Sequence, residues 1–167
     1  SAAGCVHDST QVISNVYLPA SANFTVNAEN CLKDTSFFTS TSNGNGNAIA
    51  NWNWDFGDGS PKVAIQHPTY LYATSGTKNI KHWIVTDKGC KSDTIAKSIV
   101  VNPLPTGNFN VSLPSCETKN ISFTDASLAN AGSLAGWKWD FGDLSSGTSN
   151  LSILQTSSHS FSVAGNY

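Results

Sequence analysis

The chain has 167 residues, of which 39% are hydrophobic and only 12% are charged, and its formal net charge is -2. Binding to a nucleic-acid backbone needs grouped Lys and Arg side chains, and the sequence has no such cluster. No apolar run reaches the ~18 residues that cross a bilayer, so we expect no membrane insertion. Ser, Thr, Asn and Gly take the place of the missing charges, which is typical of secreted and cell-surface β-proteins.

Five segments, taken in chain order, are predicted to be short strands because β-branched and aromatic residues concentrate in them. They are residues 23–26, 35–39, 50–56, 78–86 and 94–101. Several alternate apolar and polar residues, and no stretch shows a sustained helical period. Clusters of Gly and Asn, which form turns readily, separate the segments. Many short strands at regular spacing predict an all-β, immunoglobulin-like sandwich.

The sequence repeats itself with a constant offset of 85 residues. The block at residues 52–58 (WNWDFGD) returns at residues 137–143 (WKWDFGD), and Cys31 returns as Cys116. Self-similarity at a fixed period marks an array of similar units. The chain is therefore expected to be a stretch of tandem domains.

Alignment of the repeat with itself divides the chain into three parts. Residues 1–19 are expected to be the last strand of a preceding unit plus a linker, and residues 20–103 a complete unit. Residues 104–167 are expected to be a partial unit that lacks its last strands, with four extra residues near positions 144–149. We therefore expect tandem β-sandwiches, the terminal one incomplete.

The densest motif in each unit is W-x-W-D-F-G-D. Its residues are Trp52, Trp54, Asp55, Phe56, Gly57 and Asp58 in the first copy, and Trp137, Trp139, Asp140, Phe141, Gly142 and Asp143 in the second. Trp52, Trp54 and Phe56 are spaced by two, so we expect them on one face of a strand, with Asp55 on the other. The Asp58 carboxylate can accept backbone N–H groups in the tight turn that follows.

These motifs resemble the PKD domain, the polycystic-kidney-disease type of immunoglobulin-like sandwich, and the resemblance covers essentially the whole chain. The W-D-F-G-D-G block of that family matches residues 54–59, and its later P-x-H-x-Y and G-x-Y motifs are similar to residues 68–72 with Gly76. In the second unit the later motifs are similar to residues 159–161 and 165–167. The cysteines resemble the subtype found in surface and secreted proteins of Bacteroidetes-type bacteria.

Three residues depart from the family pattern. Lys78 stands where the family usually has an aromatic residue, and His82 stands where it usually has an aliphatic one. We expect either a shifted register of that strand or a softer core in the first unit. Leu144 replaces the last glycine of the turn in the second unit, so we expect that turn to differ in geometry.

The resemblance implies a non-enzymatic extracellular module. We expect a stalk or spacer segment of a bacterial surface fibre or adhesin, whose partners are neighbouring repeats or identical protomers. An incomplete unit would leave an open sheet edge, which the strand in residues 1–19 of another copy could complete to form a head-to-tail filament. The alternative is an accessory module of a secreted polysaccharide- or protein-degrading enzyme. Binding to surface glycans would then need exposed aromatic residues, for which Tyr17, Tyr70 and Trp83 are the candidates.

We expect no catalytic residues, no cofactor and no metal. Asp55 with Asp58, and Asp140 with Asp143, are carboxylate pairs of the kind that catalysis or calcium binding uses. However, residues three apart across a strand end point in different directions, and one turn offers too few oxygens for calcium. Zinc is disfavoured because its ligands normally come in close pairs, and this sequence has no closely spaced Cys pair.

The four cysteines favour an oxidising compartment. They are Cys5, Cys31, Cys90 and Cys116. In an immunoglobulin-like sandwich, Cys31 falls in the first turn and Cys90 in the last, at opposite ends of strands ~25 Å long, whereas a disulfide needs Cα atoms within ~7 Å. One hypothesis is that each Cys31-type thiol pairs with the Cys90-type thiol of the following unit. The other is a bond between Cys31 and Cys90 in a different strand layout.

Two kinds of glycosylation signal are present. Asn-x-Ser/Thr triplets begin at Asn23, Asn110, Asn120 and Asn150, although a chain rich in these residues produces them by chance. Ser9 and Thr94 each follow an Asp at the same place in successive units. They resemble the O-glycosylation motif of Bacteroidetes-type bacteria, and the alternative is a simple hydroxyl at the start of a strand.

Overall fold

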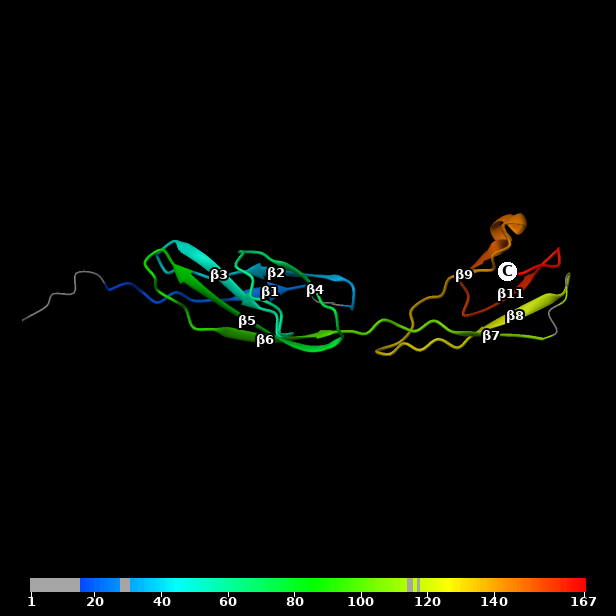
Figure 1. The fold of residues 1–167 in the computed structure, drawn as a ribbon, viewed down its shortest axis with the longest axis horizontal. Coiled ribbons are helices and arrows are strands. Elements are labelled where there is room, and N and C mark those ends of the chain that lie inside the picture. The colour runs from blue at the N-terminus through cyan, green and yellow to red at the C-terminus, as the bar shows by residue number, and fades with distance from the viewer. Residues whose placement is uncertain (1–15, 28–30, 114–115, 117) are drawn as a thin grey trace, which may run out of the picture. The chain divides into compact units, whose positions relative to one another are not determined.

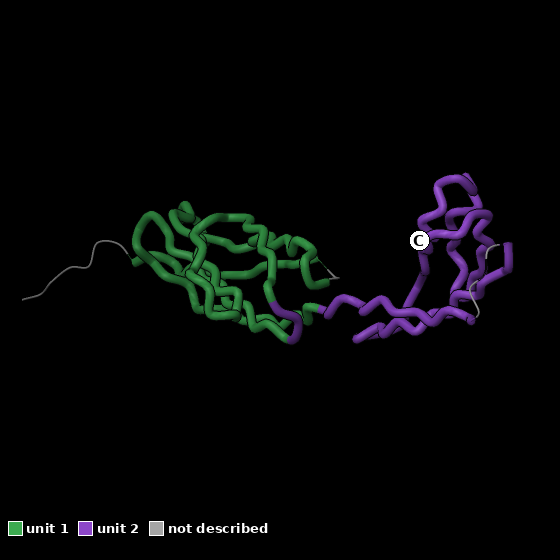
Figure 2. The backbone as a smooth tube through the Cα atoms, turned by 45° about the vertical axis from the view of Figure 1, so that its right-hand side comes forward, with its two compact units in different colours: residues 1–73, 77–101 green, residues 74–76, 102–167 purple. Residues whose placement is uncertain are grey.

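The computed structural model describes residues 16–27, 31–113, 116 and 118–167. They form two compact units (Figure 2). Unit 1 comprises the described residues up to 73 together with residues 77–101, and unit 2 comprises residues 74–76 and the described residues from 102 to 167. Over the described part of the chain, no helix is long and apolar enough to cross a membrane.

Unit 1 contains two three-stranded sheets (Figure 1). One sheet has the order β1 (Phe24–Val26), β2 (Thr35–Ser40), β4 (Thr69–Leu71), and the other has the order β3 (Ile49–Asp55), β5 (Gly76–Thr86), β6 (Ile95–Val101). The prediction of an all-β immunoglobulin-like sandwich is confirmed, and the five predicted segments correspond to β1, β2, β3, β5 and β6. The three-residue strand β4 was not predicted.

Aromatic side chains from both sheets fill the core of unit 1. Phe24, Phe38, Trp54 and Phe56 are all at most 1% exposed. Trp54 lies edge-on to Phe24 with ring centroids 5.2 Å apart, and its Nε1–H donates to the carbonyl of Ile65 at 2.8 Å. The indole is therefore both packed and hydrogen-bonded, as a buried Trp requires.

The two unusual residues of strand β5 both lie on its buried face. Lys78, Ile80, His82 and Ile84 alternate as buried positions along it. His82 stacks on Trp54 with ring centroids 3.8 Å apart. The core therefore accepts an imidazole at this position as a flat ring against the indole.

Hydrogen bonds satisfy both nitrogens of the buried His82 ring. Nδ1 lies 2.9 Å from the carbonyl oxygen of Asn53, which can only accept, so Nδ1 carries the proton. Nε2 lies 3.1 Å from the hydroxyl of Ser40 and 3.0 Å from that of Ser42. Burial lowers the pKa of His82, although the hydrogen bond to Asn53 acts in the opposite direction. The ring is thus held in its neutral form.

Unit 2 has the sheet order β11 (Thr156–Ser160), β8 (Asn120–Asp125), β7 (Phe109–Val111) and a two-stranded ladder of β9 (Trp139–Asp140) with β10 (Leu151–Ser152). A 3-10 segment, η1 (Leu144–Asn150), lies where the repeat alignment places four extra residues. Turns of this kind are short and local, so the insertion is accommodated without disturbing the adjacent strands.

The core of unit 2 repeats the ring geometry of unit 1. Trp139 and Phe141 have centroids 6.5 Å apart and an interplanar angle of 11°, and Trp54 and Phe56 have 6.5 Å and 10°. Trp139 Nε1 donates to the carbonyl of Leu154 at 2.6 Å, the counterpart of the bond that Trp54 makes. The sequence repeat is therefore a repeat of side-chain packing as well.

Candidate functional site

The carboxylates of the first signature block belong to its own turn. Asp55 Oδ1 accepts the N–H of Gly57 at 3.0 Å, and Asp58 Oδ1 accepts the N–H of Ser60 at 3.0 Å. Asp58 Oδ2 also accepts the hydroxyl of Tyr70 at 2.7 Å. Partial burial acts to raise the pKa of Asp58, but the hydrogen bonds from Ser60 and Tyr70 outweigh it and lower the pKa. The block therefore shapes a turn.

The second block forms a similar turn with different partners. Asp140 Oδ1 accepts the N–H of Gly142 at 3.0 Å, and Asp143 Oδ2 lies 3.0 Å from Nε2 of the buried His159. Hydrogen bonds from Ser145 and then His159 lower the pKa of Asp143. The structure describes no cluster of three or more His, Cys, Asp or Glu side chains that could hold a metal ion. Each of these carboxylates is engaged within its own unit.

The outer tryptophans of the two blocks lie at the edge of the core. In the first block Trp52 is partly buried and Trp54 is fully buried. In the second block Trp137 and Trp139 are both partly buried. In unit 1 burial therefore increases along the strand from Trp52 to Trp54.

Cys31, Cys90 and Cys116 carry free thiols. Cys5 lies outside the described residues. Cys31 is located between β1 and β2, and Cys90 is located between β5 and β6. Cys116 precedes β8 and is exposed.

Strand pairing places the two cysteines of unit 1 at opposite ends of the sandwich. The first residue of β3, Ile49, pairs with Thr86, which lies just before the turn that holds Cys90. The carbonyl of Phe56, just after β3, accepts the hydroxyl of Tyr72 at 3.2 Å. The adjacent residue of β4 pairs with Thr35, which lies just after Cys31. The seven-residue strand β3 runs between these two ends and spans ~23 Å. Cys31 and Cys90 are therefore too far apart for a disulfide.

The glycosylation candidates differ in accessibility. Thr94, Asn110 and Asn120 are exposed, and Ser9 lies outside the described residues. Asn23 is exposed, but its side-chain oxygen accepts from the N–H of Phe24 and from the ammonium of Lys97. Asn150 is only 4% exposed, with its amide bonded to Asp140 and to the backbone of Asp143, so it cannot carry a glycan in the folded unit.

The aromatic candidates for glycan binding lie on different elements of unit 1. Tyr17 is 41% exposed in the segment before β1. Tyr70 stacks on Phe56 with ring centroids 4.1 Å apart, so it belongs to the margin of the core. Trp83 lies in the other sheet, with the ammonium groups of Lys62 and Lys91 at 5.1 and 5.3 Å from its ring. Tyr70 and Trp83 therefore lie on strands of different sheets.

Comparison with known proteins agrees with the fold. The PKD domain family model matches residues 19–101. The PKD1 domain of the Vibrio cholerae metalloprotease PrtV is similar, with 26% identity, a TM-score of 0.45, and coverage of 50% of this chain and 98% of that domain. The PKD1 domain of Vibrio anguillarum Epp has 20% identity and a TM-score of 0.46, and the match covers 52% of this chain and 96% of that domain.

A third structure comes from a study of carbohydrate-binding modules of the β-sandwich superfamily. It has 18% identity and a TM-score of 0.50, and the match covers 66% of this chain and 56% of that one. Identity at this level reflects a shared sandwich fold only.

The two packed sheets and the repeated signature turn define an immunoglobulin-like β-sandwich module of the extracellular type. Residues 19–101 form a PKD domain. PKD domains are typically non-catalytic modules of secreted proteins.

Proposed function

We propose that the chain is a non-catalytic spacer segment in the stalk of a bacterial surface fibre or adhesin. The observation that carries this proposal is the path of the chain through unit 1. The chain enters unit 1 beside Asn43, because Ser21 pairs with Asn43. At the same end of the unit, the backbone N–H of Asp87 donates to the carbonyl of Ala48. β6 then runs back from that end and finishes at Val101. Each unit therefore adds about one strand length, ~23 Å, to an array.

A lysine links the first and last strands of unit 1. The ammonium of Lys97 in β6 donates to the carbonyl of Phe24 in β1 and to the side-chain oxygen of Asn23 at 3.0 Å. It also lies 4.9 Å from the centroid of the Phe24 ring. Tension applied to the chain ends would act along these two strands, so the contact resists shear where a stalk bears load.

Single-molecule stretching of the 167-residue chain between attached handles tests the proposal. We expect unit 1 to unfold in one step with a length gain of roughly 260 Å, because ~80 residues extend by up to ~3.5 Å each from a folded unit ~23 Å long. Gradual extension without a distinct unfolding force would contradict a role as a load-bearing spacer.

The finer form of the proposal is a head-to-tail polymer. Residues 1–19 correspond in the repeat to β6, and in unit 1 β5 lies between β3 and β6. A strand of the β6 type would therefore complete unit 2 beside a β5-type strand, and not directly on the β9 edge. Sedimentation across a wide concentration range tests the polymer: self-association supports it, and a monomer throughout contradicts it but leaves the spacer proposal intact.

We also infer that glycans on this segment attach at the accessible positions Thr94, Asn110 or Asn120. Their exposed side chains project from strands or strand starts, where a bulky sugar would not disturb the core. Glycopeptide mapping of the native protein tests this inference. Occupancy at the buried Asn150 would contradict it.

A further inference from the structure

A tryptophan with two lysines beside it lies on the outer face of the β3–β5–β6 sheet of unit 1. Trp83 is in β5 between the buried residues His82 and Ile84, so alternation along the strand turns its ring away from the core. The side chain is partly exposed, whereas Trp54 of the core is fully buried. Trp83 therefore offers part of an aromatic surface to the solvent.

Two segments that are far apart in the sequence bring the lysines to this ring. Lys62 lies beside Val63, which forms a bridge with β3, and Lys91 forms a bridge with Val85 of β5. The Nζ atoms of the two lysines lie 5.1 and 5.3 Å from the centroid of the Trp83 ring. Because both ammonium groups lie beside the same ring, one ligand can contact the ring and both charges.

The charge of these two lysines is not neutralised within the part of the chain that the structure describes. The ion pairs there involve Lys88 and His159, and neither Lys62 nor Lys91 is paired with a described carboxylate. Like charges that are brought together repel each other, and a bound anion relieves that repulsion. The arrangement therefore favours a negatively charged ligand.

Further polar groups surround the ring on the same face. Asn53 lies directly opposite Trp83 in the ladder of β3 with β5, and Asp55 lies directly opposite Lys81. Residues that lie opposite each other share a face of the sheet. With the two lysines beside the ring, this surface holds three ammonium groups against the Asp55 carboxylate, and an amide that can bond to hydroxyl groups.

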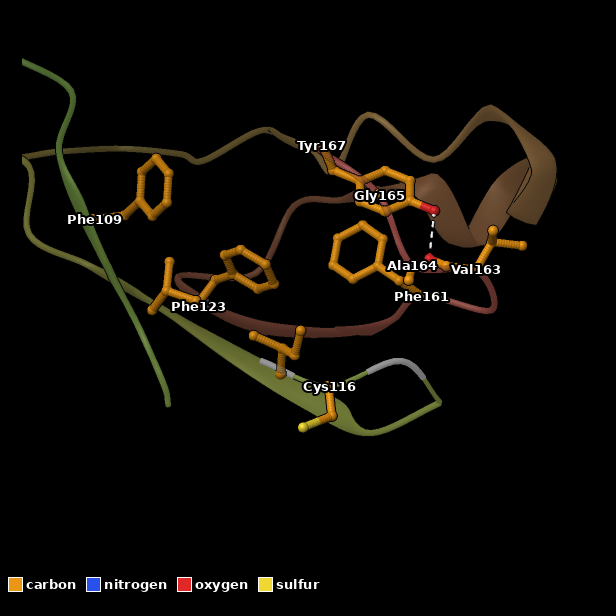
Figure 3. Close-up of a pocket in the computed structure, with 10 residues that line it drawn as sticks. Phe109, Cys116, Phe123, Phe161, Val163, Ala164, Gly165 and Tyr167 are labelled. Atoms are coloured by element: carbon orange, nitrogen blue, oxygen red, sulfur yellow. Dashed lines mark hydrogen bonds between the residues drawn. The ribbon is translucent and has the colours of Figure 1, made fainter. Parts of the chain in front are cut away.

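The pocket of unit 2 lacks this combination of ring and charge. Figure 3 shows Phe109, Phe123 and Phe161 along that pocket, with Tyr167 beside Phe161. The described residues that line it include no charged side chain. The face around Trp83 is therefore the better candidate for a charged ligand.

We infer that the face around Trp83 binds an acidic polysaccharide. The apolar C–H face of a sugar ring packs on the exposed part of the indole, because both surfaces are then removed from water. Carboxylate or sulfate groups of the polymer pair with Lys62 and Lys91, and the Asn53 amide bonds to sugar hydroxyls. A neutral glycan would leave both ammonium groups unpaired. The inference goes beyond the spacer role, since it gives unit 1 a ligand of its own.

Calorimetric titration of the 167-residue protein with three hexasaccharides tests this inference. The probes are a hexamer of galacturonic acid, which carries carboxylates, a heparin-derived hexasaccharide, which also carries sulfates, and neutral maltohexaose. We expect at least one acidic probe to bind ~10-fold or more tightly than maltohexaose, and to lose affinity as the salt concentration rises. The tighter acidic probe identifies the anionic group. No binding of either acidic probe, or equal affinities for all three, would overturn the inference.

A pair of double variants locates the site. Lys62→Gln with Lys91→Gln removes both ammonium groups from the ring and should weaken binding of the acidic probe at least ~10-fold. Lys119→Gln with Lys138→Gln is the matched control, because it removes the same charge from exposed residues of unit 2. Equal losses in the two double variants would show an effect of net charge only and would overturn the inference.

Substitution of Trp83 tests the contribution of the ring. Trp83→Ala should weaken binding of the acidic probe by about 10-fold, and Trp83→Phe, which keeps a flat ring, should retain most of the affinity. Thermal unfolding verifies that both variants stay folded. Unchanged binding by Trp83→Ala would overturn the inference.

A short oligothymidylate serves as the competing anionic ligand. If it bound more tightly than both acidic sugars, the inference would be overturned, because a nucleic acid would then be the partner. The stretching experiment on unit 1 involves no ligand. A failure of the polysaccharide inference is therefore distinguishable from a failure of the spacer proposal.

Discussion

The hydroxyl of Tyr70 donates to the carboxylate of Asp58 at 2.7 Å, next to a ring stack with Phe56. In unit 2 the same place is taken by His159, whose Nε2 lies 3.0 Å from Asp143 and whose ring lies parallel to Phe141. Two different side chains thus connect the signature turn to a strand of the facing sheet in the same way. The ring supplies packing and its polar atom holds the turn.

Substitution of His159 separates these two contributions. His159→Phe should lower the urea midpoint of unit 2, because Asp143 loses a hydrogen-bond partner in a buried setting. His159→Tyr restores the arrangement of unit 1 and should retain most of the stability. Tryptophan fluorescence during urea unfolding measures both variants. Equal midpoints for the Phe and Tyr variants would show that the hydrogen bond contributes nothing.

The stability of unit 1 should depend on pH through His82. Burial lowers the pKa of this group in the folded state below its ordinary value of 6.5, so the unfolded chain binds the proton first. The stabilising contribution is complete above about pH 6.5 and is lost as the pH falls towards the folded-state pKa.

Urea midpoints between pH 7.5 and pH 5.0 measure this effect, and His82→Phe removes the titrating group. The carboxylates with lowered pKa values, such as Asp58, lie below this window. We expect the wild-type midpoint to fall and that of the variant to change much less. If the midpoints of the wild type and the variant fell equally with pH, the assignment of the pH dependence to His82 would be contradicted.

Gly57 should tolerate no side chain. Its left-handed φ of 74° and the 2.5 Å separation between an added Cβ and the carbonyl oxygen of Asn79 combine strain with a backbone clash. We expect Gly57→Ala to cost more than the ~1 kcal/mol of left-handed strain alone. Gly59→Ala is the control, because Gly59 has a φ of 83° with nothing within 4 Å, and it should cost only that strain. Thermal unfolding of both variants measures which substitution costs more stability.

Lys97 should contribute more to mechanical than to thermodynamic stability. Lys97→Met keeps the aliphatic stem but removes the hydrogen bonds to β1. We expect an equilibrium loss of about 1 kcal/mol, and a clear decrease in the force at which unit 1 unfolds. Lys88→Met, which removes an exposed ammonium paired with its neighbour Asp87, is the control. The same force for both variants would show that Lys97 carries no load.

The repeat, the fold class and five strands of unit 1 could be predicted because apolar alternation and the W-D-F-G-D block are local signals. The buried state of His82 could not, since it depends on hydroxyl groups of Ser40 and Ser42 that only the folded chain brings to the ring. Asn150 matches a glycosylation triplet in sequence, but its burial depends on the path of η1. Long-range polar partners of this kind leave no local pattern.

The most direct test of the account is a non-reducing peptide map of the native protein. The central claim is that the chain enters unit 1 at one end and leaves at the other, with Cys90 and Cys31 at those two ends. The account predicts no disulfide between Cys31 and Cys90 of one chain, and predicts links that join a Cys31-type thiol to the Cys90-type thiol of another unit. A bond between Cys31 and Cys90 within one chain would contradict it.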